Sequence, residues 1–229
     1  MKTRSFIFAL AMFAALPIAG AQQNPPIAPP STENTGAQTI DAIAVRIDTG
    51  VITESEVREL TDFQMLVDGT SKPRDEAIRE LTDQWIVQGE ADAAHFAHPS
   101  DQDIDEAYAD LVKQFPSQAA FDQRRMQAGL SQDAVRRELA QQIYLSRFLD
   151  FRFRPAAEVS DADVQKYYDE QFAPQLKAKG EAVPALDQVQ EKIREVLVQR
   201  DITDRANQWL DDTRSRLEID VLPAAGGAQ

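Results

Sequence analysis

The stretch of sequence that decides the fold is residues 42–57, AIAVRIDTGVITESEV. Apolar and other side chains alternate over residues 43–47, which is typical of a short, half-buried strand. A Thr49-Gly50 turn then leads to a second apolar pair, Val51-Ile52. Directly after it, Thr53-Glu54-Ser55-Glu56 is a capping box, which marks the start of a helix. The segment therefore predicts a strand, a turn and a capped helix in direct succession.

A matching strand is expected at the other end of the chain, where Leu217, Ile219 and Val221 alternate with Glu218 and Asp220. A short strand is not stable alone, because its edge groups and its apolar face need partners. Each of these two strands has only the other as an obvious partner. We therefore expect the two ends of the chain to pair in one small sheet and to belong to one domain.

The region between the strands has the apolar periodicity of helices. Serines at 100, 117, 131 and 160 stand at positions typical of N-caps, and the prolines in this region fall between the periodic segments or at their edges. The fold class that follows is mainly α with one small β-sheet. The helices are expected at about 53–67, 73–85, 100–115, 117–128, 131–153, 160–172 and 186–213.

The N-terminus has the three parts of a secretory signal peptide. Lys2 and Arg4 precede an apolar run, Phe6–Leu16, and small residues follow up to Ala21. As a helix this run would reach roughly 16 Å, against about 30 Å for the hydrocarbon core of a bilayer, so it is too short to span a membrane. We expect cleavage between Ala21 and Gln22 and release of a soluble protein into the periplasm.

The remaining chain is predicted to hold one domain between two flexible tails. Residues 22–38 are rich in proline and small polar residues, a composition typical of a disordered linker. Residues 223–229 are similarly small and glycine-rich. The expected organisation is a signal peptide at 1–21, a linker at 22–38, a single domain at 39–222 and a tail at 223–229.

The composition excludes several functions. Lys and Arg number 24 against 38 Asp and Glu, a net charge of −14, and no basic run exists that could neutralise a phosphate backbone. We therefore expect no nucleic acid partner. The chain has no cysteine, which excludes disulfides, thiolate nucleophiles, cysteine zinc sites and cysteine-linked lipids.

Two arrangements of residues resemble metal sites, but both lack ligands that such a site needs. The acidic run that begins at Asp101 resembles an EF-hand loop, but Glu106 stands where the loop needs glycine and Val112 where it needs a bidentate glutamate. His95 and His98 could share a metal, yet no third or fourth ligand is in view, and a pair of surface histidines is the favoured alternative. We predict no metal and no other cofactor.

Catalytic motifs are also missing, and the residues of interest are apolar. No G-x-S-x-G sequence is present, and no histidine lies near a serine at a strand-to-helix turn. Aromatic and methionine side chains are adaptable contacts for many partners. The same side chains often belong to a helical core, which is the competing interpretation. The candidate client-binding residues are Phe121, Met126, Phe148, Phe151 and Phe153.

The order of these motifs resembles the SurA and PpiC/PrsA group of secreted foldases. The likeness covers nearly all of the mature chain and rests on order and spacing together. The segments that carry it are 42–57, 100–105, 121–129, 159–168, 188–193, Trp209-Leu210 and 217–222. It implies a helical chaperone module that binds unfolded polypeptides, with the opening and closing strands paired in a small sheet.

One departure from the family changes the functional expectation. The family's enzymes carry a parvulin-type prolyl isomerase domain of roughly a hundred residues between the helix with the Tyr167-Tyr168 pair and the last helix. Here only residues 173–185 lie between Phe172 and Leu186, and they contain no histidine, cysteine or aromatic residue. The resemblance therefore implies the family's chaperone module without the prolyl isomerase domain.

The function expected from the sequence is an ATP-independent periplasmic chaperone that binds unfolded exported proteins, such as outer-membrane β-barrel precursors. Two alternatives stay open: a foldase related to peptidyl-prolyl isomerases, and a structural subunit that holds one fixed partner. The terminal strands could also pair between two chains, which would give a strand-swapped homodimer.

Overall fold

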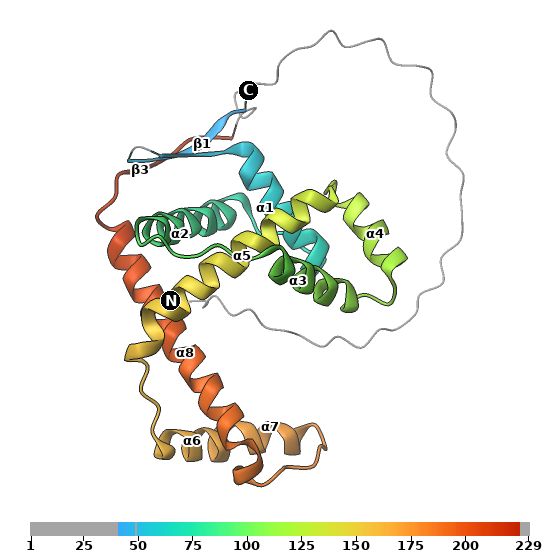
Figure 1. Cartoon of the computed structure of the whole chain (residues 1–229), viewed down its shortest axis with the longest axis vertical. Coiled ribbons are helices and arrows are strands. Elements are labelled where there is room, and N and C mark those ends of the chain that lie inside the picture. Colours follow the sequence, from blue (N-terminus) through green and yellow to red (C-terminus); the bar gives the residue numbers. More distant parts are fainter. Residues whose placement is uncertain (1–40, 49, 225–229) are drawn as a thin grey trace.

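The computed structural model describes residues 41–48 and 50–224. The predicted signal peptide with its Ala21/Gln22 cleavage position, the predicted linker and most of the predicted tail lie outside these residues. The chain is mainly helical with one small sheet, as predicted (Figure 1). The elements in chain order are β1 (Ile43–Ile47), β2 (Gly50–Thr53), α1 (Glu54–Asp68), α2 (Arg74–Ala93), α3 (Asp101–Lys113), α4 (Gln118–Gln127), α5 (Gln132–Phe153), the 3-10 turn η1 (Arg154–Ala156), α6 (Asp161–Tyr167), the π-helical turn η2 (Tyr168–Phe172), α7 (Ala173–Ala178), α8 (Leu186–Arg214) and β3 (Ile219–Val221).

The two ends of the chain meet in a three-stranded antiparallel sheet of order β2-β1-β3. Val45 of β1 lies opposite Ile52 of β2 and Val221 of β3. The predicted pairing of the opening and closing strands is confirmed. The expectation that each had only the other as a partner was wrong, because β2 folds back onto β1. Asp48 turns the chain there with a left-handed φ of 45°.

Hydroxyl side chains start most of the helices where the sequence places them. At Thr53, Ser100 and Ser160 the hydroxyl accepts the N–H of the third helical residue, and the carboxylate of that residue accepts the N–H of the cap. Ser117 and Ser131 cap α4 and α5 through their hydroxyls alone. These bonds satisfy N–H groups that have no partner inside a helix, so the predicted starts of these five helices are confirmed.

Most of the molecule forms what we call the body, residues 41–153 and 201–224. Three clusters of buried apolar side chains hold it together. One lies between the sheet and helices α1 and α2 and contains Leu60. Another joins α1, α3, α4 and α5 around Phe121, and the last joins α2, α5 and α8 around Phe148.

The remaining residues, 154–200, form a smaller part that we call the lobe. It consists of η1, α6, η2, α7 and the first half of α8, and it lies at the far end of α8 from the sheet (Figure 1). Val164, Ala173 and Ile193 are its buried apolar side chains. Because α8 continues from the lobe into the body without a break, this one helix connects the two parts.

The lobe departs from the prediction in one place. The helix that starts after Ser160 was expected to end near Phe172, and a Pro/Gly-punctuated stretch was expected after it. The chain instead passes through the π-helical turn η2 and continues as α7 to Ala178. Pro174 lies in the first turn of α7. A proline ring clashes with the preceding turn of a regular helix, and the wider π-helical turn accommodates it.

Candidate functional site

The five predicted client-binding residues separate into buried and exposed ones. Phe121 is 0% exposed and Phe148 is 2% exposed, so both are core residues that a partner could reach only after local unfolding. Phe121 packs edge-on against Tyr108 and Phe115, with ring centroids 5.5 and 5.2 Å away. Both residues thus belong to the helical core, as the competing interpretation of the sequence predicted.

The other three predicted residues reach the surface. Met126 on α4 is 65% exposed and Phe151 near the end of α5 is 63% exposed. Phe153 is half-buried, and its ring lies 5.9 Å from that of Trp209 on α8. Phe151 and Phe153 both lie at the end of α5, where residues two apart point to different sides of the helix, and Met126 lies on α4.

Phe151 belongs to a larger aromatic surface. The ring of Phe96, in the connection between α2 and α3, lies 5.4 Å from Phe151, 5.6 Å from Phe148 and 5.9 Å from Tyr144. His98 stacks on Tyr144 at 4.3 Å. What we call the aromatic surface has a floor of Tyr144 and Phe148 and an accessible layer of Phe96, His98, Phe151, Phe153 and Trp209.

Phe96, His98, Tyr144 and Trp209 were not among the predicted client-binding residues. The end of α2 explains the position of Phe96. The N–H of Phe96 donates to the carbonyl of Ala91, and the N–H of His95 donates to that of Asp92, which is the Schellman pattern of a helix C-terminus. His95 takes the left-handed conformation with φ 53°, a place usually held by glycine. This motif turns Phe96 back onto the cluster that contains Ala91.

The two histidines that suggested a metal site have other surroundings. His95 forms the left-handed turn, and His98 stacks on Tyr144, whose hydroxyl donates to the Asp92 carboxylate at 2.7 Å. Burial and this carboxylate raise the pKa of Tyr144 to about 12. Within residues 41–48 and 50–224, no group of three or more His, Asp or Glu side chains is placed to hold a metal ion.

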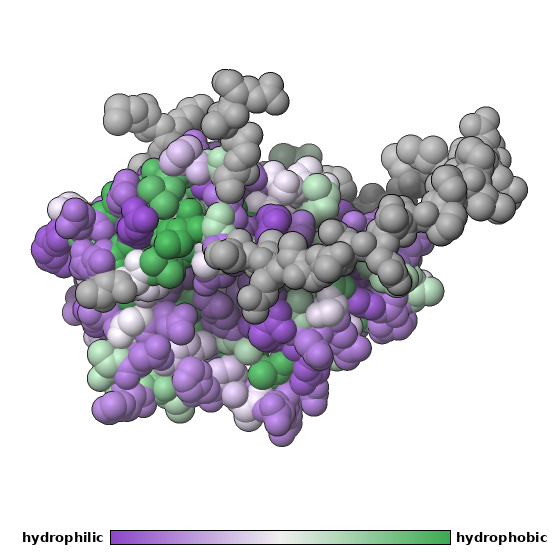
Figure 2. All heavy atoms as spheres, turned by 90° about the horizontal axis from the view of Figure 1, so that it is seen from above, coloured by the Kyte–Doolittle hydropathy of each residue, from purple (hydrophilic) through white to green (hydrophobic). Residues whose placement is uncertain are grey.

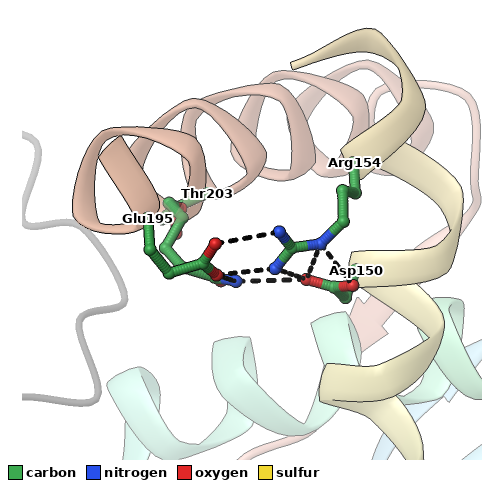
Figure 3. A network of polar contacts seen from close by, with 5 residues as sticks. Asp150, Arg154, Glu195 and Thr203 are labelled. Carbon is green, nitrogen blue, oxygen red and sulfur yellow. Dashed lines mark hydrogen bonds and ion pairs between the residues drawn. The ribbon is translucent and has the colours of Figure 1, made fainter. Parts of the chain in front are cut away.

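A polar network holds the end of α5, and with it Phe151 and Phe153, against α8 (Figure 3). The Arg154 guanidinium donates to Asp150 and to Glu195 of α8, each with a shortest distance of 2.7 Å. The Gln199 amide donates to the same two carboxylates at 3.1 and 2.9 Å. Hydrogen bonds from Arg154 lower the pKa of Asp150 and lower that of Glu195 to about 2.

Arg152 adds a cation to the aromatic surface. Its guanidinium lies over the rings of Trp209 and Phe153, at 4.8 and 5.7 Å from their centroids. It also contacts the Glu90 carboxylate at 3.3 Å. Cation–π contacts of this kind stabilise the rings by about 0.5–1 kcal/mol at exposed sites. They help to keep the rings of Phe153 and Trp209 in place against each other.

Among the hollows on the described part of the chain, two are open and shallow. One of about 210 Å³ adjoins the aromatic surface, where His98, Pro99, Ile104 and Tyr144 contribute to its lining. The other, of about 680 Å³, lies between α1 and α4, and its lining residues are Met65, Ala120, Gln123, Arg124, Gln127 and Ala128. Open hollows of this kind suit partial contact with a flexible partner better than enclosure of a small substrate.

Burial raises the pKa of Asp62, Asp83 and Glu138 in the body, and the shifts are large for Asp83 and Glu138. Burial raises the pKa of Asp83 to about 6, although its partner Arg214 acts against the shift. Burial and the neighbouring Glu59 charge raise the pKa of Glu138 to about 7. Neither carboxyl lines a hollow. We therefore assign both groups to the packing of helices.

In the described part of the chain, no helix is both long enough and apolar enough to cross a bilayer.

Comparison with known proteins found no matching family model and no matching curated protein. Among solved structures, the chain is similar to one from Campylobacter jejuni, reported for the virulence factor PEB4 and the periplasmic protein Cj1289, two structurally related SurA-like chaperones. The match covers 80% of this chain and 100% of that chain, with a TM-score of 0.48 and 13% sequence identity.

Proposed function

We propose that this protein is an ATP-independent periplasmic chaperone that holds unfolded exported polypeptides, with outer-membrane β-barrel precursors as the expected clients. The observation that carries the proposal is the aromatic surface, above all Phe151, which is 63% exposed and stands beside Phe96 on a buried aromatic floor. Exposed apolar area that is held in place by polar contacts lowers the entropic cost of binding a flexible partner.

The strength of binding fits a holding function. A Phe side chain that becomes fully buried contributes about 1.5–3 kcal/mol, so contact with two or three partly exposed rings gives weak, reversible binding. Release then needs no nucleotide. The acidic charge of the chain, −14 in total, helps to keep a loaded complex soluble.

We propose further that the protein holds its clients without catalysing prolyl isomerisation. The segment in which the family's enzymes carry their isomerase domain holds only α7 and the connection to α8. A short X-Pro peptide tests this proposal, because cis–trans isomerisation has a barrier of about 18–20 kcal/mol and is slow without a catalyst. We expect no acceleration by the purified protein; acceleration that survives repurification would contradict the proposal.

Light scattering of an unfolded porin diluted from denaturant tests the chaperone function. We expect the wild-type protein to delay aggregation at a stoichiometric ratio and the Phe96→Ala/Phe151→Ala double variant to lose most of this delay. The matched control is Val196→Ala, because Val196 is also an exposed apolar residue, at 46%, but lies on the lobe. Absence of any delay with the wild-type protein would exclude the function.

Two further variants separate stability from binding. Phe151→Ala alone removes the most exposed ring with little expected effect on folding, so it remains informative if the double variant unfolds. Met126→Ala tests the predicted contact on α4 in the same assay. A scattering curve for Phe151→Ala that matches the wild type would place client binding elsewhere than the aromatic surface.

A further inference from the structure

The strand β3 lies at an edge of the sheet and offers unpaired main-chain groups. Arg46 lies opposite Asp220, and the N–H of Leu222 donates to the carbonyl of Ala44. Because successive residues of a strand point their main-chain groups to opposite sides, those of Ile219 and Val221 point away from β1. Among the described residues, none hydrogen-bonds to them.

Apolar side chains accompany this edge. Val221 is 50% exposed, and Ile219, on the same face of the sheet, is partly buried. On the opposite edge, Val51 of β2 is 48% exposed. Figure 2, which looks onto the molecule from the side where the sheet lies, shows strongly hydrophobic atoms gathered over that region. An exposed edge with apolar side chains is a template for a further strand.

The charged side chains of residues 217–224 are acidic, and basic side chains reach this segment from neighbouring elements, since Arg46 contacts Asp220 and Arg74 donates to the Leu222 carbonyl. Residues 217–224 include Glu218 and Asp220 and contain no Lys or Arg. The side chain of Asp220 is 61% exposed, and its cross-strand contact is with Arg46, at 3.6 Å. Directly opposed charges on neighbouring strands stabilise a sheet when their signs differ. A strand added beside β3 is therefore favoured when it brings a basic side chain next to Asp220.

We propose that the free edge of β3 binds an extended polypeptide segment as an added strand, and that the preferred segment alternates apolar residues with Lys or Arg. Its apolar side chains lie beside Ile219 and Val221, and its basic side chain lies beside Asp220. Main-chain hydrogen bonds supply affinity and the alternate side chains supply selectivity, as in other cases of strand addition. This second binding surface is independent of the aromatic surface.

Fluorescence anisotropy with a short labelled peptide of alternating Val and Lys tests the proposal. Control peptides are an alternating Val/Glu peptide and a peptide with all Val residues in one block and all Lys residues in another. We expect the alternating Val/Lys peptide to bind best. Equal binding of the block peptide would overturn the proposal, because nonspecific charge attraction would then explain the affinity.

Val221→Pro tests the edge directly. Proline removes the N–H that points away from β1 and leaves the pairing of β3 with β1 in place, as at natural edge strands. The matched control is Val221→Thr, which keeps the N–H and the β-branched shape. We expect Val221→Pro to weaken peptide binding about tenfold and Val221→Thr to bind nearly as well as the wild type.

A second variant covers the case in which Val221→Pro perturbs the sheet. Asp220→Asn keeps the size of the side chain and removes its charge, so we expect weaker binding of the Val/Lys peptide and stronger binding of the Val/Glu peptide. Unchanged preference in this variant, or wild-type affinity in Val221→Pro, would overturn the proposal. The Phe96→Ala/Phe151→Ala variant should bind the peptide normally, which distinguishes failure of the aromatic surface from failure of the edge.

Discussion

The body and the lobe are built from the same kinds of helices and are stabilised in different ways. In the described part of the chain, all three buried apolar clusters lie in the body. The lobe fully buries Val164, Ala173 and Ile193, and it adds polar contacts and half-buried aromatic ones such as the stacked rings of Tyr168 and Phe172. Arg194, for example, donates to the Val159 carbonyl at 2.9 Å and to Asp161 at 2.6 Å. The comparison shows that helix content says little about local stability.

This difference has a functional side. Segments with few buried apolar contacts open at lower free energy than the core of a domain. The aromatic surface lies on the body, close to the network of Asp150, Arg154 and Glu195 that joins it to the lobe. On the proposed function, the packed body holds the aromatic rings in place, and the lobe, which buries fewer apolar side chains, is the part expected to adjust to a client.

The largest expected effect comes from a substitution in the core of the body. Phe121→Ala removes a fully buried ring that contacts Tyr108 and Phe115, and we expect it to lower the free energy of unfolding by about 3–5 kcal/mol. Denaturant unfolding followed by circular dichroism measures the loss. A change below about 1 kcal/mol would show that this cluster does not hold the body together.

The matched change in the lobe is Val164→Ala, since Val164 is 1% exposed. We expect a local cost of about 1–3 kcal/mol, which appears as faster amide exchange in α6 and α7 while exchange in α1 and α5 stays unchanged. Hydrogen exchange with mass spectrometry reports both regions at once. Equal acceleration in the body would show that the two parts unfold as one unit.

Acid acts on the body through Glu138, whose pKa burial raises from 4.5 to about 7. The folded state therefore binds this proton more tightly than the unfolded state does, and stability rises as the pH falls from 8 through 7 and levels off near 4.5. Asp83 acts in the same direction, since its pKa rises from 3.8 to about 6. We expect a gain of about 1–3 kcal/mol between pH 8 and 5.

Thermal unfolding at a series of pH values measures this dependence. In Glu138→Gln the neutral amide replaces the titrating carboxyl, so the slope between pH 6 and 8 should fall while the part due to Asp83 remains. Glu59→Gln is a useful companion, because the charge of Glu59 is one cause of the raised pKa of Glu138. An unchanged slope in Glu138→Gln would assign the dependence to other groups.

The junction with the lobe responds to acid in the opposite direction. Arg154 lowers the pKa of Glu195 from 4.5 to about 2. The contribution of this contact is therefore present above pH 4.5 and is lost as the pH falls toward 2. Mild acid should stabilise the body and leave the contact between Arg154 and Glu195 intact. Stronger acid should break this contact and destabilise the lobe first.

Two capping boxes give a smaller and closely matched test. Ser100 starts α3 in the body and Ser160 starts α6 in the lobe, and both make the same pair of hydrogen bonds. Replacement by alanine costs about 1 kcal/mol at such a position. Ser100→Ala should lower the midpoint of global unfolding, whereas Ser160→Ala should change only amide exchange within the lobe. A lowered global midpoint in both variants would remove the distinction.

The sequence predicted the body well because its signals are local. The capping boxes at Thr53 and Ser100 and the alternation in the two terminal strands depend on neighbouring residues, and the structure confirms them. The continuation of the helix through Pro174 was missed, because proline usually ends a helix and π-helical turns are too rare to be expected there.

The candidate site was less predictable, because exposure depends on packing between distant segments. Phe148 and Phe151 are three positions apart on α5, yet one is buried against α2 and α8 and the other is exposed. Phe96 was missed because it follows the left-handed His95, outside any periodic pattern. An aromatic residue in a connection between helices was the signal that could have found it.

The smallest effect concerns the junction itself. Arg154→Gln removes the guanidinium that bridges Asp150 and Glu195, but these groups are partly exposed to solvent, so the cost should stay below about 1 kcal/mol. Arg154→Lys is the matched control: it keeps the charge and loses the planar fork that contacts both carboxylates. Amide exchange in the lobe should become faster in both variants, and more so in Arg154→Gln. The dependence of this exchange on salt should weaken in Arg154→Gln, which loses the charge, and persist in Arg154→Lys. Unchanged exchange in Arg154→Gln would mean that the continuity of α8, and not this network, holds the lobe to the body.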